Sequence, residues 1–283
     1  MTDASDKYPT ESERRRFVKG IVGSATLAGV GTGAAGVVNS ATSAPGEGGG
    51  SVAYFGPRNT DGPAPRAMPQ IPVGIDSEGY LKGVWPEAKE VETDDGRVVT
   101  VAETDLGGVT YSSTWFQYCG VETNPNVRPD ADHDDYLRYG SPSPYDWQNE
   151  TFDGDEKVHV EHFDDYESWG NEVGRDGLGK PAKVTWRSQE VEPRDTLPVQ
   201  LVRSPRVEAM AEESEWLSAS TERGFLAVLA KCTHFCCVPA FKAYEDSRKF
   251  GAADQIYCQC HQSAYDPFDV VKRSFVARPR PPE

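Results

Sequence analysis

The chain has 283 residues, enough for one or two domains with a hydrophobic core and additional tails. Its 45 Asp and Glu outnumber its 29 Lys and Arg, which gives a formal net charge of −16 at pH 7. This balance excludes nucleic acid as an expected partner, because phosphate binding needs clustered Lys and Arg. The acidic residues are dispersed along the chain. Such a pattern keeps a surface hydrated and favours a salt-adapted source over an ordinary acidic surface.

The N-terminal segment has the features of an export signal. Arg14, Arg15 and Arg16 begin a basic run, and an uncharged stretch rich in Gly, Ala and Val follows it over 20–38. A twin arginine ahead of a weakly apolar segment is typical of proteins exported in folded form. We therefore expect residues 1–44 to form a twin-arginine signal or a transmembrane helix whose N-terminus is cytoplasmic. Cleavage after small residues near its end and a buried Gly/Ala-rich helix are the alternatives.

The remaining chain divides by composition into three parts. Residues 45–66 are rich in Gly and Pro and are predicted to form a flexible linker. Residues 67–165 are expected to form an accessory β-rich and acidic region, in which 121–155 is a long surface excursion. Residues 166–283 are expected to form the C-terminal domain.

Short apolar runs between turn signals predict a mainly β structure. Strands are expected over 97–102, 197–202 and 225–230, because each run follows or precedes Gly, Pro or Asp-Gly punctuation. Helical periodicity is clear only over 206–217.

Two segments near the C-terminus carry the chemistry: Cys-Thr-His-Phe-Cys-Cys from Cys232 and Cys-Gln-Cys-His-Gln-Ser-Ala-Tyr from Cys258. Each offers one Cys and one His at loop spacing, so two facing loops can enclose a metal. Zinc, with two Cys and two His ligands in a small binding module, is the first alternative. Zinc leaves the additional cysteines, Ser263 and Tyr265 without roles.

These segments resemble the two boxes of Rieske proteins, C-x-H-x-x-C and C-x-C-H-x-S, at every metal and disulfide position. The resemblance implies a [2Fe–2S] cluster whose ligands are Cys232 and Cys258 on one iron, and His234 and His261 on the other. It also implies a Rieske fold of stacked antiparallel β-sheets, with a small cluster-binding subdomain over 231–268.

A disulfide between Cys237 and Cys260 is implied by the same resemblance and suits an exported protein. Rieske ferredoxins lack this pair, so it indicates the quinol-linked branch of the family. In that branch, Ser263 and Tyr265 donate hydrogen bonds that raise the cluster potential, and His261 contacts the quinol.

The resemblance thus implies the iron–sulfur subunit of a quinol:cytochrome c oxidoreductase of the cytochrome bc type, from a halophilic archaeon. It would work in a respiratory chain, anchored to the cell membrane with its Rieske domain on the extracytoplasmic face. Its partners would be a cytochrome b-type subunit, membrane quinol, and a cytochrome c or small copper protein as electron acceptor. The alternative is a Rieske subunit of another exported oxidoreductase, of the arsenite oxidase type or in a nitrate-respiration system.

One position departs from the family pattern. The residue before Cys237 is usually Gly, and here it is Cys236. Cys236 and Cys119 are then left over, and we expect both to be buried free thiols. A second disulfide between them is the alternative.

Other candidate residues are expected to be structural. His133, His159 and His162 lie in acidic stretches, which favours a solvated face over a metal site. Trp115, Trp169 and Trp186 are expected to anchor the core; this set is more typical of packing than of cofactor stacking.

Overall fold

The computed structural model describes residues 50–92, 96 and 98–277. The predicted signal or anchor over 1–44 and the first residues of the predicted linker lie outside the described residues. Within the described part, no helix is long and apolar enough to cross a membrane. The described residues belong to one compact unit.

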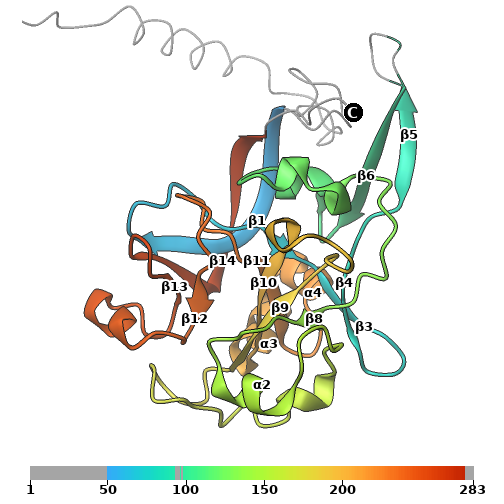
Figure 1. Cartoon of the computed structure of the whole chain (residues 1–283). Coiled ribbons are helices and arrows are strands. Elements are labelled where there is room, and N and C mark those ends of the chain that lie inside the picture. The colour runs from blue at the N-terminus through green and yellow to red at the C-terminus, as the bar shows by residue number, and fades with distance from the viewer. Residues whose placement is uncertain (1–49, 93–95, 97, 278–283) are drawn as a thin grey trace, which may run out of the picture. The chain divides into compact units, whose positions relative to one another are not determined.

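Antiparallel sheets dominate the described part, which is mainly β as predicted (Figure 1). One sheet has the order β1 (Gly50–Asp61), β14 (Ser263–Ala277), β13 (Ile256–Cys258), β12 (Ala240–Phe241). A second has the order β2 (Gln70–Ile71), β11 (Phe225–Leu229), β10 (Pro198–Arg203), β9 (Lys180–Thr185), β8 (Arg138–Tyr139). The two smaller sheets are β3 (Val73–Ile75) with β4 (Leu81–Gly83), and β5 (Ala88–Glu92) with β6 (Val98–Leu106) and β7 (Val109–Ser112).

Short helices connect these strands. The α-helices are α2 (Asp146–Thr151), α3 (Pro205–Glu213) and α4 (Glu215–Ser220). The 3₁₀ turns are η2 (Ser113–Phe116), η3 (Val121–Thr123), η4 (Pro125–Val127), η5 (Val160–Phe163), η6 (Pro193–Asp195) and η7 (Glu245–Phe250).

The helix predicted over 206–217 is present but divided in two. Ser204 accepts a hydrogen bond from the Arg206 N–H and starts α3, with Pro205 at the first helical position. Ser214 has an extended backbone, and its hydroxyl accepts from the Leu217 N–H to start α4. The Ser214 cap therefore interrupts the helix, although the hydrophobic spacing alone predicts one continuous helix.

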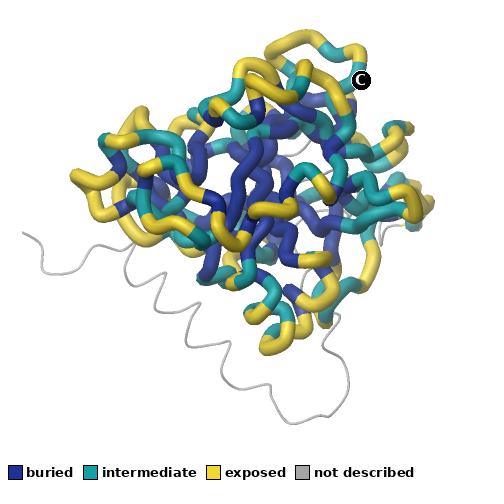
Figure 2. The backbone as a smooth tube through the Cα atoms, turned by 90° about the horizontal axis from the view of Figure 1, so that it is seen from below, coloured by how far each residue is buried: buried dark blue, intermediate teal, exposed yellow. Residues whose placement is uncertain are grey.

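The core lies around the central strands of the five-stranded sheet. Every residue of β10 and β11 is buried, because both faces of these strands are covered. Figure 2 shows buried backbone through the interior and exposed backbone at the turns. β6, β10 and β11 confirm the three predicted strands. The three Trp side chains predicted as core anchors are buried: Trp115, Trp169 and Trp186.

The flexible linker predicted over 45–66 is wrong from Gly50 onward. Residues Gly50–Asp61 form β1, which pairs antiparallel with β14 along nearly its whole length. Its register shifts after Pro57, whose ring removes the backbone N–H that a regular ladder would use. At Gly56, an added Cβ would lie 1.8 Å from the Met68 carbonyl oxygen, so glycine serves close packing here rather than flexibility.

The boundary predicted at 165/166 does not separate two units. The five-stranded sheet takes β2 and β8 from one side of it and β9, β10 and β11 from the other. The excursion predicted over 121–155 is also wrong, because apolar side chains placed between its acidic residues are buried in the core: Val127, Leu137, Tyr139 and Tyr145.

Candidate metal centre

Two loops bring the predicted ligands together. The first loop, residues 231–239, leads from β11 to β12, and the second loop, residues 259–262, is the turn between β13 and β14. Cys258 ends β13 and lies opposite Ser263, the first residue of β14. The Gln262 N–H donates to the Cys258 carbonyl and closes the turn. Cys258 is therefore fixed by the sheet, whereas Cys232 lies within the first loop, where its N–H donates to the Cys237 carbonyl.

Cys232 and Cys258 are the two cysteines of the chain outside disulfides, and both are buried. The hydrogen bond with Cys258 lowers the pKa of Cys232 to about 5. The same hydrogen bond, together with burial, raises the pKa of Cys258. The hydrogen bond between the two thiols thus favours the thiolate form at Cys232. A thiolate is the form of cysteine that binds metal.

Backbone N–H groups of the loops point at both sulfurs. The His234 N–H hydrogen-bonds with the Cys232 thiol and lowers its pKa. The N–H groups of Cys260 and His261 do the same for Cys258. In each loop, a donor comes two residues after the cysteine, so the loop backbone itself stabilises negative charge on sulfur.

Both hydroxyls predicted to tune the cluster lie beside Cys232. The Tyr265 oxygen is 3.2 Å from the Cys232 sulfur and accepts a hydrogen bond from the Thr233 N–H at 3.2 Å. Burial raises the pKa of Tyr265, and the nearby sulfur raises it further. Ser263 also hydrogen-bonds with Cys232 and lowers the pKa of that thiol. Its hydroxyl accepts from the Ala64 N–H at 3.1 Å, which fixes its position.

The two predicted histidine ligands face each other. The ring centroids of His234 and His261 are 4.7 Å apart and their planes are nearly perpendicular. His234 Nδ1 is buried and has no hydrogen-bond partner among the described residues, whereas His261 is exposed. Phe235 lies 4.3 Å from the His234 ring and 5.4 Å from the His261 ring, and is 67% exposed. A buried imidazole nitrogen without a hydrogen-bond partner is available as a metal ligand.

Two disulfides hold the first loop. The structure contains the Cys237–Cys260 bond that the resemblance implies, and this bond joins the two loops. It also contains a Cys119–Cys236 bond, so the expectation of two free thiols is wrong. The fold brings these cysteines together although they are 117 residues apart in sequence. Cys119 and Cys236 both adopt the left-handed conformation, with φ of 56° and 63°, a region of backbone space that favours glycine.

The donor atoms are arranged in pairs rather than around a single point. The sulfurs of Cys237, Cys258 and Cys260 lie within 4.8 Å of one another, but two of them form a disulfide and offer no thiolate. No three of the four predicted ligands meet that distance. A single zinc ion holds its ligands at about 2.0–2.3 Å, so any three would meet it. Two sulfurs in one pair and two imidazoles in another suit two metal ions.

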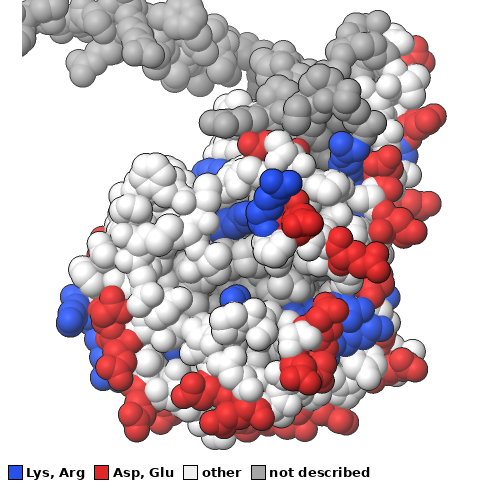
Figure 3. Space-filling model, in the orientation of Figure 1, with Lys and Arg blue, Asp and Glu red and all other residues white. Residues whose placement is uncertain are grey.

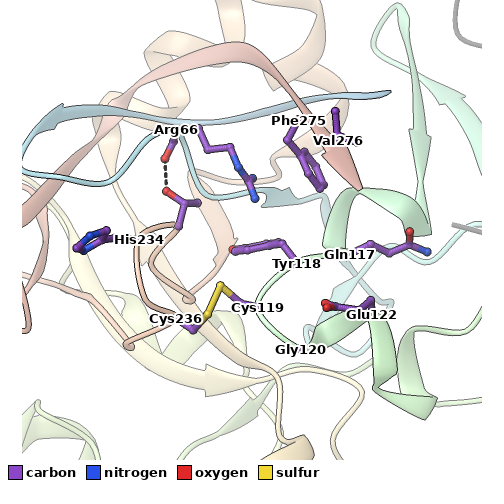
Figure 4. A pocket seen from close by; sticks show the side chains of 11 residues that line it. Arg66, Gln117, Tyr118, Cys119, Gly120, Glu122, His234, Cys236, Phe275 and Val276 are labelled. Carbon is purple, nitrogen blue, oxygen red and sulfur yellow. Dashed lines mark hydrogen bonds between the residues drawn. A yellow bond between two sulfur atoms is a disulfide. The ribbon is translucent and has the colours of Figure 1, made fainter. Parts of the chain in front are cut away.

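A pocket of about 430 Å³ lies beside the first loop (Figure 4). Its walls include His234 and the Cys119–Cys236 disulfide. The Arg66 guanidinium points into it, over the rings of Tyr118 at 4.7 Å and Phe275 at 4.1 Å. No sequence signal predicted these neighbours, since they come from the predicted linker, the predicted accessory region and the end of β14.

Apart from Lys231 at the start of the first loop, the loops carry no charged side chain. Residues 232–241 and 257–265 contain no Asp, Glu, Lys or Arg. On the face seen in Figure 3, acidic side chains are spread along the left, lower and right margins. Charge at the two thiols is stabilised by hydrogen bonds from the loop backbone and from the hydroxyls of Ser263 and Tyr265 in β14.

The remaining histidines are structural, but His159 and His162 are not on a solvated face as predicted. His159 caps η5 by accepting from the Glu161 N–H, and His162 Nδ1 lies 3.0 Å from the Tyr139 hydroxyl. Burial lowers the pKa of His162 and, likewise, the pKa of His133. Hydrogen bonds within η5 explain the half-buried positions of His159 and His162.

No protein-family model, curated protein or solved structure matches this chain.

Proposed function

We propose that this chain is a Rieske protein, with the Rieske fold, that carries single electrons on a [2Fe–2S] cluster. The observation that carries the proposal is the pairing of two buried cysteine thiols with two facing imidazoles across two loops joined by a disulfide. The resemblance of both loop sequences to the Rieske boxes supports the same assignment.

The residues present fit such a cluster. Cys232 and Cys258 would hold one iron and His234 and His261 the other, which fits the hydrogen-bonded pair of thiols and the facing pair of imidazole rings. The buried, unpartnered Nδ1 of His234 supports its role as a ligand. Bound there, a [2Fe–2S] cluster accepts and releases one electron at a time, at a potential raised by its two neutral imidazoles.

The protein's own groups favour the reduced state. The hydroxyls of Tyr265 and Ser263 and the backbone N–H of His234 all hydrogen-bond with Cys232, so added negative charge meets donors already in place. These donors need no rearrangement when the charge changes. Burial of both thiols excludes water from the sulfurs.

His261 is the residue proposed to contact membrane quinol. Its ring is exposed while its neighbour His234 is half-buried, so a substrate can reach it. An exposed ring nitrogen can accept the quinol proton, which lets proton and electron leave the quinol together. The electron would pass to a cytochrome c or a small copper protein. The two disulfides support an oxidising, extracytoplasmic location for the domain, within a membrane complex of the cytochrome bc type.

Electron paramagnetic resonance of the reduced, purified protein, combined with a redox titration across pH, tests this function. We expect a Rieske spectrum and a high potential that depends on pH. A colourless protein that contains zinc instead of iron would contradict the proposal. Electron transfer from quinol that a quinol-site inhibitor blocks would favour the cytochrome bc type. Reduction by an arsenite-linked partner, or electron transfer to a nitrate-linked partner, would favour the alternative complex.

A further inference from the structure

The segment between η2 and η3 lies directly behind the first loop. The Tyr118 hydroxyl donates to the Lys231 carbonyl at 2.8 Å, one residue before Cys232. The next residue, Cys119, is bonded to Cys236 near the other end of the loop, with Cα atoms 5.4 Å apart. The segment therefore holds the loop on both sides of the two ligands that it supplies.

The Cys119–Cys236 disulfide also lies close to the backbone of Cys232. The Cys119 sulfur is 3.6 Å from the Cys232 carbonyl oxygen. A sulfur in a disulfide has no proton to donate, so this contact is packing against the ligand's own backbone. The Cys236 N–H donates to the same carbonyl, which links the disulfide to Cys232 by a second route.

The segment is itself held firmly in place. Trp115 and Phe116 of η2 are each 1% exposed, and Tyr118 is 6% exposed. Figure 4 shows the Arg66 side chain reaching over the Tyr118 ring. The Arg66 carbonyl also accepts a hydrogen bond from the Thr233 hydroxyl at 2.6 Å. Because this segment is fixed to the core, its contacts with the first loop can hold that loop in a defined position.

The two disulfides have different consequences for the first loop. Cys237–Cys260 joins it to the second loop, so this bond fixes the loops relative to each other. Cys119–Cys236 joins it to a segment rooted among buried aromatic residues. The Cys119–Cys236 bond thus adds a covalent link between the first loop and the core, beyond the main-chain connections to β11 and β12.

We propose that Tyr118 and Cys119 form a brace that positions the first loop, so that Cys232 and His234 are held in the geometry that sets the cluster's electronic properties. This inference rests on the proposed function. Both are positioning residues, since they touch the loop and not the cluster. The brace assigns a role to part of the region predicted only as accessory.

A merely stabilising disulfide is the competing explanation. Such a bond restricts the unfolded chain and raises the melting temperature without altering the folded site. The two explanations differ in spectroscopy: a stabilising bond leaves the folded cluster unchanged, whereas a brace alters its spectrum and potential when removed.

The test compares the purified, cluster-loaded full chain with the double variant Cys119→Ser/Cys236→Ser and with Tyr118→Phe. Tyr118→Phe keeps the disulfide and the buried ring and removes only the hydrogen bond to Lys231. Val158→Ala is the control, because it opens a small gap at a buried position outside both loops and their strands. The measurements are the paramagnetic resonance g values, the midpoint potential and the rate of iron loss.

We expect shifted g values and a shifted potential in the double variant, with iron lost on the order of tenfold faster. Tyr118→Phe should shift the g values and the potential in the same direction by less. Val158→Ala should melt at a lower temperature with a wild-type spectrum.

Wild-type g values and potential in the double variant, whatever its melting temperature, would overturn the brace. If the double variant does not fold, wild-type g values and a wild-type potential in Tyr118→Phe are sufficient to overturn the brace. A wild-type chain without iron and sulfide would overturn the proposed function and the brace with it. A loaded wild type with unaltered variants overturns only the brace.

Discussion

The Tyr265 hydroxyl and the Cys232 sulfur are 3.2 Å apart, although Tyr265 lies in β14, Cys232 lies in the first loop, and they are 33 residues apart in sequence. The same hydroxyl accepts from the Thr233 N–H, which orients it toward the sulfur. Tyr265 thus stabilises negative charge on Cys232, a proposed ligand, and also holds the backbone of the next residue, Thr233.

Tyr265→Phe should lower the cluster potential, because the hydrogen bond stabilises added charge on Cys232 more than it stabilises the oxidised state. We expect a decrease of up to about 60 mV, the equivalent of tenfold in a one-electron equilibrium. Redox titration monitored by paramagnetic resonance measures it. Tyr257→Phe is the matched control, since Tyr257 is buried in β13 and its hydroxyl lies 3.5 Å from Asp246. Equal potentials in both variants would show that the Tyr265 hydrogen bond does not tune the site.

Breaking the disulfide between the loops should destabilise the centre. The bond closes a sequence separation of 23 residues, for which chain entropy gives about 3 kcal/mol. Cys237→Ser/Cys260→Ser should therefore lower the melting temperature by roughly 6–12 °C and reduce the iron content after purification. Calorimetry and iron analysis measure the two effects. Retention of the wild-type melting temperature and iron content would contradict this role.

Gly56→Ala should strongly destabilise the first sheet. A Cβ at this position would lie 1.8 Å from the Met68 carbonyl oxygen, so β1 or the segment after it must shift. We expect a loss of at least about 3 kcal/mol in the free energy of unfolding, measured by denaturant titration. Ser51→Ala is the control, as an exposed position on the same strand. Similar stabilities for the two variants would mean that the strand tolerates the added carbon.

Stability should fall as pH decreases below about the ordinary histidine pKa of 6.5. Burial, and then the charge of His159, lower the pKa of His162 in the folded chain. The unfolded chain therefore binds more protons in this window, and the stabilisation present above pH 6.5 is lost as pH falls toward the lowered pKa.

His162→Asn removes that titration, so its stability should change less than the wild type's between about pH 7.5 and 5.5. His133, whose pKa is also lowered by burial, keeps part of the pH dependence in the variant. Thermal unfolding followed by circular dichroism compares the two proteins. An identical pH dependence would exclude His162 as its source.

Short stretches of sequence were enough to predict the buried strands and the spacing of the candidate ligands. The apolar runs of β10 and β11 needed no knowledge of their partners, because both faces of these strands are buried. The ligand spacing within each loop was equally local. Pairing between distant segments was not visible: Tyr54 and Arg273 are opposite each other in β1 and β14, yet Gly and Pro around Tyr54 indicated a linker.

The same limit explains the second disulfide. Cys119 has a sequence environment with no metal or disulfide motif, and only the fold places it beside Cys236. An acidic segment likewise reads as surface when its buried residues, such as Val127 and Leu137, are spaced singly among charges. Long-range packing, not residue composition, decides such positions.

The most direct test of the central claim is pulsed paramagnetic resonance of the reduced protein labelled with ¹⁵N-histidine, alongside iron and sulfide analysis. The account predicts about two iron atoms and two sulfides per chain, with couplings from two histidine nitrogens. His234→Ala should abolish this signal, whereas His133→Ala should leave it unchanged. A protein without iron, or an iron–sulfur signal without histidine couplings, would contradict it.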